Sequence, residues 1–424
     1  MLDIRRIRQE PEELQRLLAK KGVEVDFGPL LDQDAKRRQL LTQMEQLKAE
    51  RNRVSQEVAR LKKEGQESQH LIEEMREVGD RIAAFESSVR QLDDDILRLL
   101  LTIPNPPLPD VPDGKTSEDN QEVRRWGAPR SFDFAPLPHW DLGEALKIID
   151  FERARKISGA RFAVLTGMGA RLSRALIDFM LDHNRQRGYL EIAPPYLVNR
   201  DALIGTGQFP KFADDVFRVV PHELFLIPTA EVPLTNLHRD EILAEAALPI
   251  RYTGYTASFR AEAGAAGRDT RGIIRQHQFD KVELVQFVLP EESPDALERM
   301  VADAEHLLQL LGLPFRTVLL CGGDMGFAQA KTYDIEVWMP SYGRYVEISS
   351  CSNMGDFQAR RANIRYRPSA SKKTEFVHTL NGSALAVGRT IAALLENWQE
   401  PDGTVVLPEV LHPYLGGETR IVPT

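Results

Sequence analysis

Apolar residues recur at a helical period over residues 36 to 101, a stretch without proline that has Gly65 near its middle. After this glycine, steps of three and four residues connect one apolar side chain to the next: Met75, Val78, Ile82, Phe85, Val89, Leu92, Ile96 and Leu99. Such spacing is the seam of a coiled coil. Before the glycine, similar steps join a second apolar set, interrupted by Arg51: Leu40, Met44, Leu47, Val54, Val58 and Leu61. The pattern predicts two long helices that pair with each other.

The residues between the two helices predict a reversal of chain direction. Lys63-Glu64-Gly65-Gln66 has the composition of a turn, which would fold the helices into an antiparallel hairpin. With about 28 residues in the ascending helix, the arm is about 40 Å long, too long to fold back on a globular core. Taken alone, a heptad pattern favours a dimerisation or spacer element, because it specifies pairing and not a ligand.

The charges of the first helix point weakly to a phosphate-facing surface. Basic side chains gather in its second half: Lys48, Arg51, Arg53, Arg60, Lys62 and Lys63. Glutamates at 45, 50, 57 and 64 lie among them, so the charge pattern decides little without other evidence.

A proline-rich segment marks the boundary between two domains. Residues 103–112 (IPNPPLPDVP) cannot continue a helix, because proline lacks the amide donor and clashes with the preceding turn. We expect an N-terminal domain over 1–104, a linker over 105–129 and a second domain over 130–424. In the second domain, short helices alternate irregularly with β-branched and aromatic segments at 251–256, 282–288, 333–339 and 345–349. This order favours an α+β fold on an antiparallel sheet.

Composition narrows the class of protein but does not name it. Of 424 residues, 42% are hydrophobic and 28% charged, as in an ordinary soluble globular protein. There is no apolar run of eighteen residues and no signal-peptide pattern at the start, so the cytoplasm is the expected location. Cys321 and Cys351 are the only cysteines and lack zinc-site spacing, so no protein-bound zinc is expected. A net charge of −9 still permits a local basic stripe that binds nucleic acid.

Three segments of the second domain carry candidate chemistry. The first is a helix from about 171 to 187 followed by Gly188 and a short strand that ends at Pro194-Pro195; taken alone it is a structural helix beside an edge strand. The second places Arg260 and Glu262 two residues apart on one strand, with Arg271, Arg275, His277 and Phe279 on the return. A surface ion-pair ladder on a hairpin is the plain alternative for this segment.

The third segment, residues 380–389 (LNGSALAVGR), leads small residues into Arg389 at the start of an apolar helix. Tight packing of that helix on a sheet explains the small residues equally well in isolation. A helix start also offers free backbone amides to an anion. The chain has no GxxxxGK[ST] loop and no GxGxxG after a strand, so any use of ATP needs another fold.

Together the three segments resemble motifs 1, 2 and 3 of the class II aminoacyl-tRNA synthetases. Further segments resemble the bacterial-type seryl-tRNA synthetases in particular, and the likeness extends over essentially the whole chain, arm included: 205–212 (GTGQFPKF), 229–231 (TAE), 333–338 (YDIEVW), 347–353 (EISSCSN) and 356–361 (DFQARR). So many segments in the family's order do not arise by chance. The resemblance implies a homodimer that uses motif 1 as its interface, serine and ATP as substrates, and tRNA(Ser) as partner. Where the cell has one, tRNA(Sec) is a further partner.

The resemblance also implies roles for individual residues. The serine contacts carry over to Thr229, Ala230, Glu231, Glu283 and Ser383. The ATP contacts carry over to Arg260, Ala261, Glu262, Gln276, Phe279, Glu347, Ile348, Ser349, Ser350 and Arg389. In this family Arg260 would hold the α-phosphate, Glu262 and Phe279 the adenine, and Arg275 the γ-phosphate. Mg²⁺ would arrive with ATP and bind Glu347 and Ser350, and Arg260, Arg275 and Arg389 would supply the catalytic positive charge.

The chain departs from the family's usual pattern at three places. Ala384 replaces a glycine, Gln276 replaces a small apolar residue, and Met354-Gly355 interrupts the stretch after Asn353. Other classes remain as alternatives: a paralogue that aminoacylates a carrier protein would lack the arm, and a coiled-coil scaffold would need neither Arg260 nor Arg389. The related proline and threonine enzymes append an anticodon-binding domain, whereas this chain ends about 35 residues after Arg389.

Overall fold

The computed structural model describes residues 1–263 and 271–423 and divides the chain into two compact units. One unit comprises Leu2–Arg16 and Glu24–Pro104, and the other comprises Met1, Leu17–Val23 and Asn105–Thr424. We call them the helical unit and the sheet unit. Among the described residues, no helix is both long enough and apolar enough to span a bilayer.

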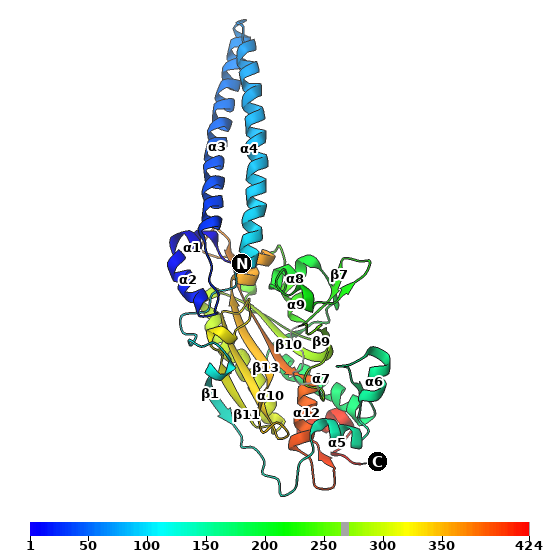
Figure 1. The fold of residues 1–424 in the computed structure, drawn as a ribbon. Helices are drawn as coiled ribbons and strands as arrows, with labels where there is room; N and C mark the ends of the chain where they lie inside the picture. Colours follow the sequence, from blue (N-terminus) through cyan, green and yellow to red (C-terminus); the bar gives the residue numbers. More distant parts are fainter. Residues whose placement is uncertain (264–270, 424) are drawn as a thin grey trace. The chain divides into compact units, whose positions relative to one another are not determined.

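The helical unit is dominated by two long helices, α3 (Gly28–Lys63) and α4 (Gln69–Thr102), which run side by side as a hairpin (Figure 1). They follow two short helices, α1 (Ile4–Gln9) and α2 (Pro11–Ala19). Along the hairpin the predicted seam residues Leu47, Val78 and Ile82 are buried together. The reversal is at Gly65, whose φ of +70° suits a residue without a Cβ atom.

The first long helix begins earlier than its apolar periodicity suggested. It starts at Gly28 rather than near residue 36, because Pro29 occupies the first turn and Asp26 accepts a hydrogen bond from the Gly28 amide at 2.8 Å. Its 36 residues give a length of about 54 Å, longer than the expected 40 Å. The predicted antiparallel helical hairpin is confirmed.

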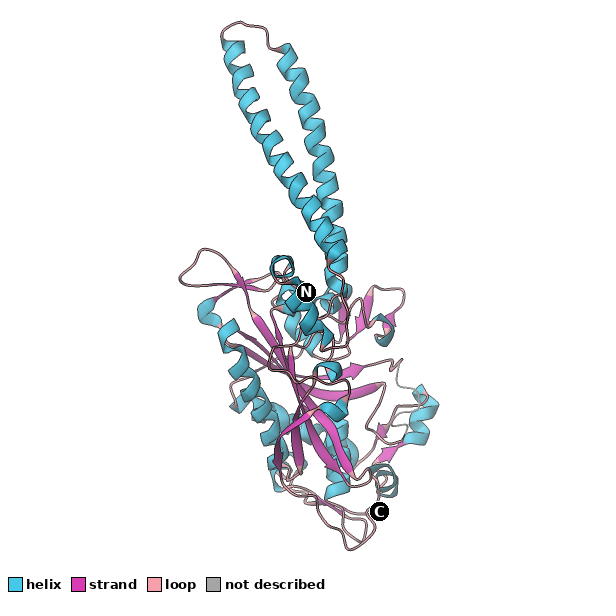
Figure 2. Ribbon diagram, turned by 60° about the vertical axis from the view of Figure 1, so that its left-hand side comes forward, coloured by secondary structure: helices cyan, strands magenta, loops and turns pink. Residues whose placement is uncertain are grey.

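The sheet unit is built on an eight-stranded sheet (Figure 2). Neighbouring strands are antiparallel except at one edge, where β4 runs parallel to β9. In spatial order the strands are β1 (Gln121–Trp126), β11 (Phe315–Leu319), β12 (Lys331–Met339), β13 (Arg344–Gly355), β16 (His378–Ala386), β10 (Gln278–Val288), β9 (Ile250–Phe259) and β4 (Leu190–Glu191). The predicted α+β class with an antiparallel sheet is confirmed.

Three helices cover one face of this sheet and form the main core with it: α7 (Met168–Gln186), α10 (Ser293–Leu310) and α12 (Val387–Asn397). Alternation along the strands decides which side chains join that core, because successive residues point to opposite faces. On β10, Val282 and Leu284 lie in the core while Lys281 and Glu283 face the other side. The second face is therefore free to carry polar side chains.

The remaining helices and small strands surround the sheet. The helices are α5 (His139–Ala145), α6 (Phe151–Ser158), α8 (Arg200–Thr206), α9 (Glu231–Asn236) and α11 (Phe357–Ala362). The strands are β2 (Ile149–Asp150), β3 (Val164–Leu165), β5 (Leu197–Asn199), β6 (Arg218–Val219), β7 (Leu224–Leu226), β8 (Ile242–Ala244), β14 (Arg365–Arg367), β15 (Glu375–Phe376), β17 (Val405–Val406) and β18 (Arg420–Ile421).

The stretch 105–129, which we expected to be a linker, contains regular structure. Residues 121–126 form β1, an edge strand of the main sheet that pairs with β11. All six residues of β1 are exposed, so the strand carries no apolar alternation that the sequence could have revealed.

Candidate active site

A cavity of about 570 Å³ opens on the polar face of the sheet. Side chains from β10, β12, β13 and β16, from the start of α12 and from the segments around 206–216, 228–231 and 273–276 line it. It brings together most of the residues that the sequence singled out: Thr229, Glu231, Arg260, Glu262, Arg275, Gln276, Phe279, Glu283, Glu347, Ile348, Ser350, Ser383 and Arg389. The predicted residues therefore share one site although they span 161 positions of the chain from Thr229 to Arg389.

Three predicted residues lie outside the wall of the cavity. Ala230 is fully buried and belongs to a separate apolar cluster. Ser349 is also buried, and its hydroxyl donates to the Ser383 carbonyl at 2.6 Å, so it supports the wall from behind. Ala261 is tied through its amide to the Asp215 carbonyl at 2.9 Å. Any contact of these residues with a ligand would run through the backbone.

Two buried carboxylates define one end of the cavity, Glu231 and Glu283. Glu283 accepts a hydrogen bond from Thr229 Oγ1 at 3.2 Å, and its Oε2 lies 2.5 Å from Lys281 Nζ. Burying a carboxylate is costly unless a cation or hydrogen bonds compensate it, and Lys281 supplies that cation. Lys281 was not among the predicted site residues, although the strand period between Phe279 and Glu283 places all three on one face.

The second carboxylate, Glu231, has a different environment. Its Oε1 accepts from Gln358 Nε2 at 2.6 Å, and Thr379 Oγ1 in turn donates to Gln358 Oε1 at 2.7 Å. Burial, followed by the negative charge of Glu283, raises the pKa of Glu231 to about 7. A ligand cation placed beside Glu231 would stabilise its ionised form, which is the arrangement expected for a bound ammonium group.

Three arginines line other parts of the cavity wall: Arg260, Arg275 and Arg389. The guanidinium of Arg260 lies over the ring of Phe279, 5.1 Å from its centroid, and Arg260 Nε donates to the Pro228 carbonyl at 3.3 Å. Arg275 forms an ion pair with Glu262. The resemblance assigned these last two residues to opposite ends of a nucleotide, whereas here they contact each other.

Arg389 lies in the first turn of α12 and contacts two other segments of the site. Its Nε donates to the Ile274 carbonyl at 3.2 Å, and its Nη1 donates to the Glu347 carbonyl at 2.6 Å. The same nitrogen lies 3.5 Å from Glu347 Oε2. Arg389 therefore joins β13 to the segment that carries Arg275.

Oxygen atoms gather where β12 and β13 face the cavity. Asp334 is paired in register with Ser350, and both line the cavity together with Glu347. Burial, then the negative charge of Glu347, raises the pKa of Asp334 well above its usual range. Asp334 Oδ1 is buried and has no hydrogen-bond partner among the described residues. Hard oxygen donors of this kind suit a small divalent cation. Asp334 lies within the segment 333–338 that resembles the family, but no role was predicted for it.

The loop 326–329 forms another part of the wall, and each of its four carbonyls accepts a hydrogen bond. Lys21 Nζ donates to Gly326 O at 2.8 Å and to Gln329 O at 2.6 Å. Asn105 donates from its backbone to Phe327 O and from its side chain to Ala328 O, each at 2.9 Å. Burial lowers the pKa of Lys21 to about 7. Nothing in the spacing of the sequence connected Lys21 with the site.

Comparison with known proteins assigns the chain to a family. The model of the "Seryl-tRNA synthetase N-terminal domain" matches residues 1–107, and that of the "tRNA synthetase class II core domain (G, H, P, S and T)" matches residues 217–398. A serine–tRNA ligase from Thermodesulfovibrio yellowstonii is 57% identical over 419 residues, which are 98% of this chain and 99% of the relative. The chain belongs to the seryl-tRNA synthetase family. This confirms the assignment made from the order of the motifs.

Solved structures of seryl-tRNA synthetases have the same fold. The crystal structure of the enzyme from Pyrococcus horikoshii complexed with ATP is 41% identical, covers 100% of both chains and has a TM-score of 0.94. The cytoplasmic serine–tRNA ligase from Naegleria fowleri in complex with AMP is 29% identical, covers 100% of this chain and 99% of the other, and has a TM-score of 0.89.

The three places where the chain departs from the usual seryl-tRNA synthetase pattern differ in whether they line the cavity. Ala384 is fully buried in the core face of β16 and does not line the cavity. Gln276 and Met354 both line it, and Gly355 has a φ of +56°. Only Gln276 and Met354 therefore change the lining of the cavity.

The environment of Glu231 leads to a prediction about stability. Between pH 4.5 and about 7 the folded chain keeps a proton on Glu231 that the unfolded chain has lost, so the free energy of unfolding falls as pH rises through this window. The expected loss is on the order of 3 kcal/mol. Glu231→Gln has no charge to bury, so we expect it to be more stable than the parent chain at pH 8 and nearly equal to it at pH 4.5.

Urea unfolding at intervals from pH 4.5 to 8 measures this difference. Glu144→Gln, on the exposed side of α5, is the matched control and should follow the parent chain. A parent and a Glu231→Gln variant with parallel pH profiles would show that Glu231 is not held in its neutral form.

Proposed function

We propose that the chain is a serine–tRNA ligase that activates L-serine with ATP and transfers the serine to the 3′ end of tRNA(Ser). The observation that carries the proposal is the division of one cavity between two buried carboxylates and three arginines. The carboxylates suit a small amino acid, whose ammonium is positive, and the arginines suit a polyphosphate. A volume of about 570 Å³ lies within the range of small-molecule sites.

Serine is selected by polar groups at the carboxylate end. Glu231 takes the substrate ammonium, while Glu283 and Ser383 satisfy the substrate hydroxyl, with Thr229 held against Glu283 at 3.2 Å. Alanine would leave these buried groups without a partner. Its kcat/KM should therefore be lower than that of serine by up to roughly 10⁴-fold, so editing against alanine is unnecessary. Threonine is excluded by the size of this end of the cavity.

Activation is an in-line attack of the serine carboxylate on the α-phosphorus of ATP, with pyrophosphate as the leaving group. Negative charge builds on phosphate oxygens, so catalysis requires positioning and cationic groups more than a general base. Arg260 holds the α-phosphate, Arg275 the γ-phosphate, and Arg389 closes over adenine and phosphate. Glu262 and Phe279 contact adenine, and Arg275 leaves its ion pair with Glu262 when both bind the nucleotide.

The oxygen donors of β12 and β13 fit Mg²⁺ that enters with ATP. Glu347 and Ser350 would hold the ion, and the nearby Asp334 would offer a further oxygen donor. When bound, Mg²⁺ offsets the negative charge of the phosphates. Among the described residues, no group of three or more histidine, cysteine or acidic side chains could hold a metal without the substrate.

The second step transfers serine from the adenylate to the terminal adenosine of tRNA. The 3′-hydroxyl attacks the mixed anhydride and AMP leaves. We assign tRNA binding to the domain 1–104, whose helical arm reads the shape of the tRNA backbone, and catalysis to 130–424. tRNA(Sec), in cells that have it, is a second acceptor.

Two further features of the family are proposed for this chain. A homodimer would form through α7 and the edge strand β4, where Leu190 is 61% exposed and would be covered. The cytoplasm, where translation takes place, is the proposed location.

The first test is pyrophosphate exchange with each of the twenty amino acids. Serine alone should support Mg²⁺-dependent exchange, because Glu231, Glu283 and Thr229 are arranged for an ammonium and a hydroxyl on one small ligand. Equal exchange with alanine or proline would contradict the assigned specificity.

Arginine substitutions test the roles of the cationic groups. Arg260→Ala and Arg389→Ala should each slow adenylate formation by more than about a hundredfold, roughly 3 kcal/mol, because each removes a positive charge from the developing phosphate charge. Single-turnover adenylate formation measures the effect. Arg344→Ala, an exposed arginine of β13, is the control and should retain the parent rate. Rates within threefold of the parent for Arg260→Ala or Arg389→Ala would exclude those roles.

Deletion of the arm separates tRNA reading from activation. Joining residue 35 to residue 101 by a short flexible linker should leave serine-dependent exchange nearly intact, since every assigned catalytic residue lies beyond 200, while aminoacylation of tRNA(Ser) collapses. Charge reversal at Arg51, Arg53 and Arg60 should weaken tRNA binding and flatten its salt dependence. Exchange by the same preparations is the internal control. Unchanged kcat/KM for tRNA(Ser) after deletion would make the arm a spacer.

A further inference from the structure

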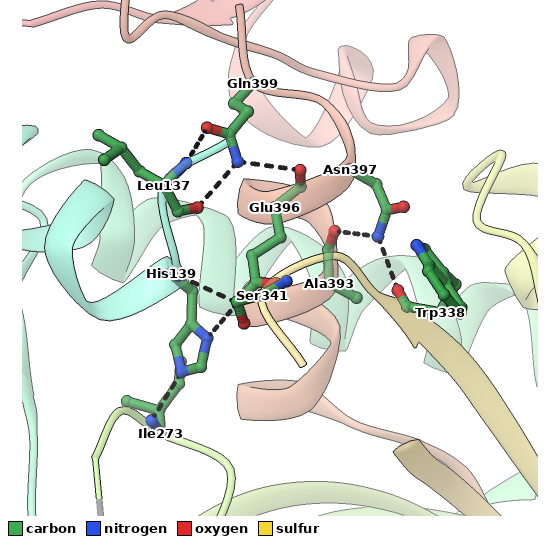
Figure 3. Close-up of polar contacts among 9 residues, drawn as sticks. All are labelled: Leu137, His139, Ile273, Trp338, Ser341, Ala393, Glu396, Asn397 and Gln399. Carbon is green, nitrogen blue, oxygen red and sulfur yellow. Dashed lines mark hydrogen bonds and ion pairs between the residues drawn. The ribbon is translucent and has the colours of Figure 1, made fainter. Parts of the chain in front are cut away.

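A buried histidine lies outside the cavity and yet contacts the backbone of its wall. His139 is the first residue of α5, and both its side chain and that of Glu396 on α12 are fully buried. Figure 3 shows the imidazole between Glu396 on one side and Ile273 on the other. The distances are 2.7 Å from His139 Nδ1 to Glu396 Oε1 and 3.1 Å from the Ile273 amide to His139 Nε2.

The partners of the imidazole determine which nitrogen carries the proton. A backbone N–H can only donate, so His139 Nε2 must be the unprotonated acceptor for Ile273. In the neutral ring the proton then resides on Nδ1, which donates to the Glu396 carboxylate. The ring is therefore oriented at both ends.

Glu396 is itself held in place by several donors. The His139 amide donates to Glu396 Oε1 at 3.1 Å, and Ser341 donates from its amide to Oε2 at 2.9 Å and from its hydroxyl to Oε1 at 2.8 Å (Figure 3). A buried carboxylate with this many donors has one preferred orientation. The backbone also approaches the ring closely: a Cβ atom at Gly272 would lie 2.1 Å from His139 Nε2.

Helix α12 thus contacts two successive residues of the cavity wall. Through Glu396 and His139 it binds the Ile273 N–H, and through Arg389 Nε it binds the Ile274 carbonyl at 3.2 Å. Ile273, Ile274, Arg275 and Gln276 all line the cavity. The two contacts fix this segment relative to the helix that carries Arg389.

We propose that His139 is a positioning residue for ATP, which fixes the segment carrying Arg275 and Gln276 in register with Arg389 by accepting the Ile273 N–H. This inference rests on the proposed function, because it needs ATP to lie between those side chains. Among the residues that the structure describes, none links His139 in this way to the serine end of the cavity, formed by Thr229 and Glu283. The effect of His139 should therefore be confined to the nucleotide.

Two substitutions of similar size distinguish the effects of the two hydrogen bonds that the imidazole ring makes. The side-chain oxygen of His139→Gln reaches the place of Nε2 and can accept from Ile273. The side-chain amide of His139→Asn reaches only the place of Nδ1, so it keeps Glu396 and loses Ile273. In pyrophosphate exchange we expect KM for ATP to rise about tenfold in the asparagine variant and less than threefold in the glutamine variant. KM for serine should stay within twofold in both.

His412→Gln is the matched control, since His412 Nε2 donates to the Leu407 carbonyl and does not line the cavity. It should keep the parent KM for ATP. Equal KM values for ATP in the asparagine and glutamine variants, or a parallel rise in KM for serine, would overturn the inference. Absence of serine-dependent exchange in the parent chain would instead overturn the proposed function.

A measurement on the unmodified chain is independent of folding in the variants. Nitrogen-15 NMR of histidine-labelled protein, with His139 identified by the slow exchange of its buried ring proton, reports which ring nitrogen is protonated. A proton on Nδ1 and none on Nε2 supports the acceptor role. A proton on Nε2 overturns it, because that nitrogen could then no longer accept from Ile273.

Discussion

Strands β10, β13 and β16 each supply side chains to the core on one face and to the cavity on the other. A single register must therefore place the apolar residues in the core and the polar residues in the cavity at the same time. On β16, Leu380 and Ala384 lie in the core, whereas Asn381 and Ser383 line the cavity. A slip of one residue in register would move every polar group into the core. Gly382 shows how close the packing is, since a Cβ atom there would lie 2.7 Å from Cys351 Sγ. The site depends on that packing for its geometry.

Irregularities in the sheet occur beside the residues on which the proposed chemistry depends. The pairing of β10 with β16 shifts register between Val282 and Glu283, and that of β12 with β13 shifts between Ile335 and Glu336, opposite Glu347. A bulge of this kind changes the direction of a side chain without ending the strand. The arrangement lets rigid strands direct carboxylates into the cavity, where Lys281 and Arg389 lie close enough to compensate them.

The sequence predicted the fold class and thirteen of the residues that line the cavity, for different physical reasons. The arm could be predicted because no proline interrupts its helical period. Arg260, Glu283 and Arg389 could be predicted because segments that resemble the family surround them. Lys281, Lys21 and His139 were not assigned a role. Lys21 and His139 act through contacts with distant parts of the chain, Gly326 and Ile273, and spacing along one segment carries no record of such contacts. Lys281 differs, because its partner Glu283 is two residues away and the strand period already places both on one face. The boundaries of β1 and α3 were missed because they depend on edge pairing and a local cap rather than on an apolar period.

Lys21 and Asn105 lie just before and just after the main excursion of the chain into the helical unit, and both bind the loop 326–329 within the sheet unit. The two ends of the excursion are therefore anchored by hydrogen bonds that do not involve the arm. Whole heptads could be gained or lost in matched pairs from α3 and α4 without altering how these ends are held. A change in the length of the arm would therefore leave the hydrogen bonds that hold this part of the cavity wall as they are.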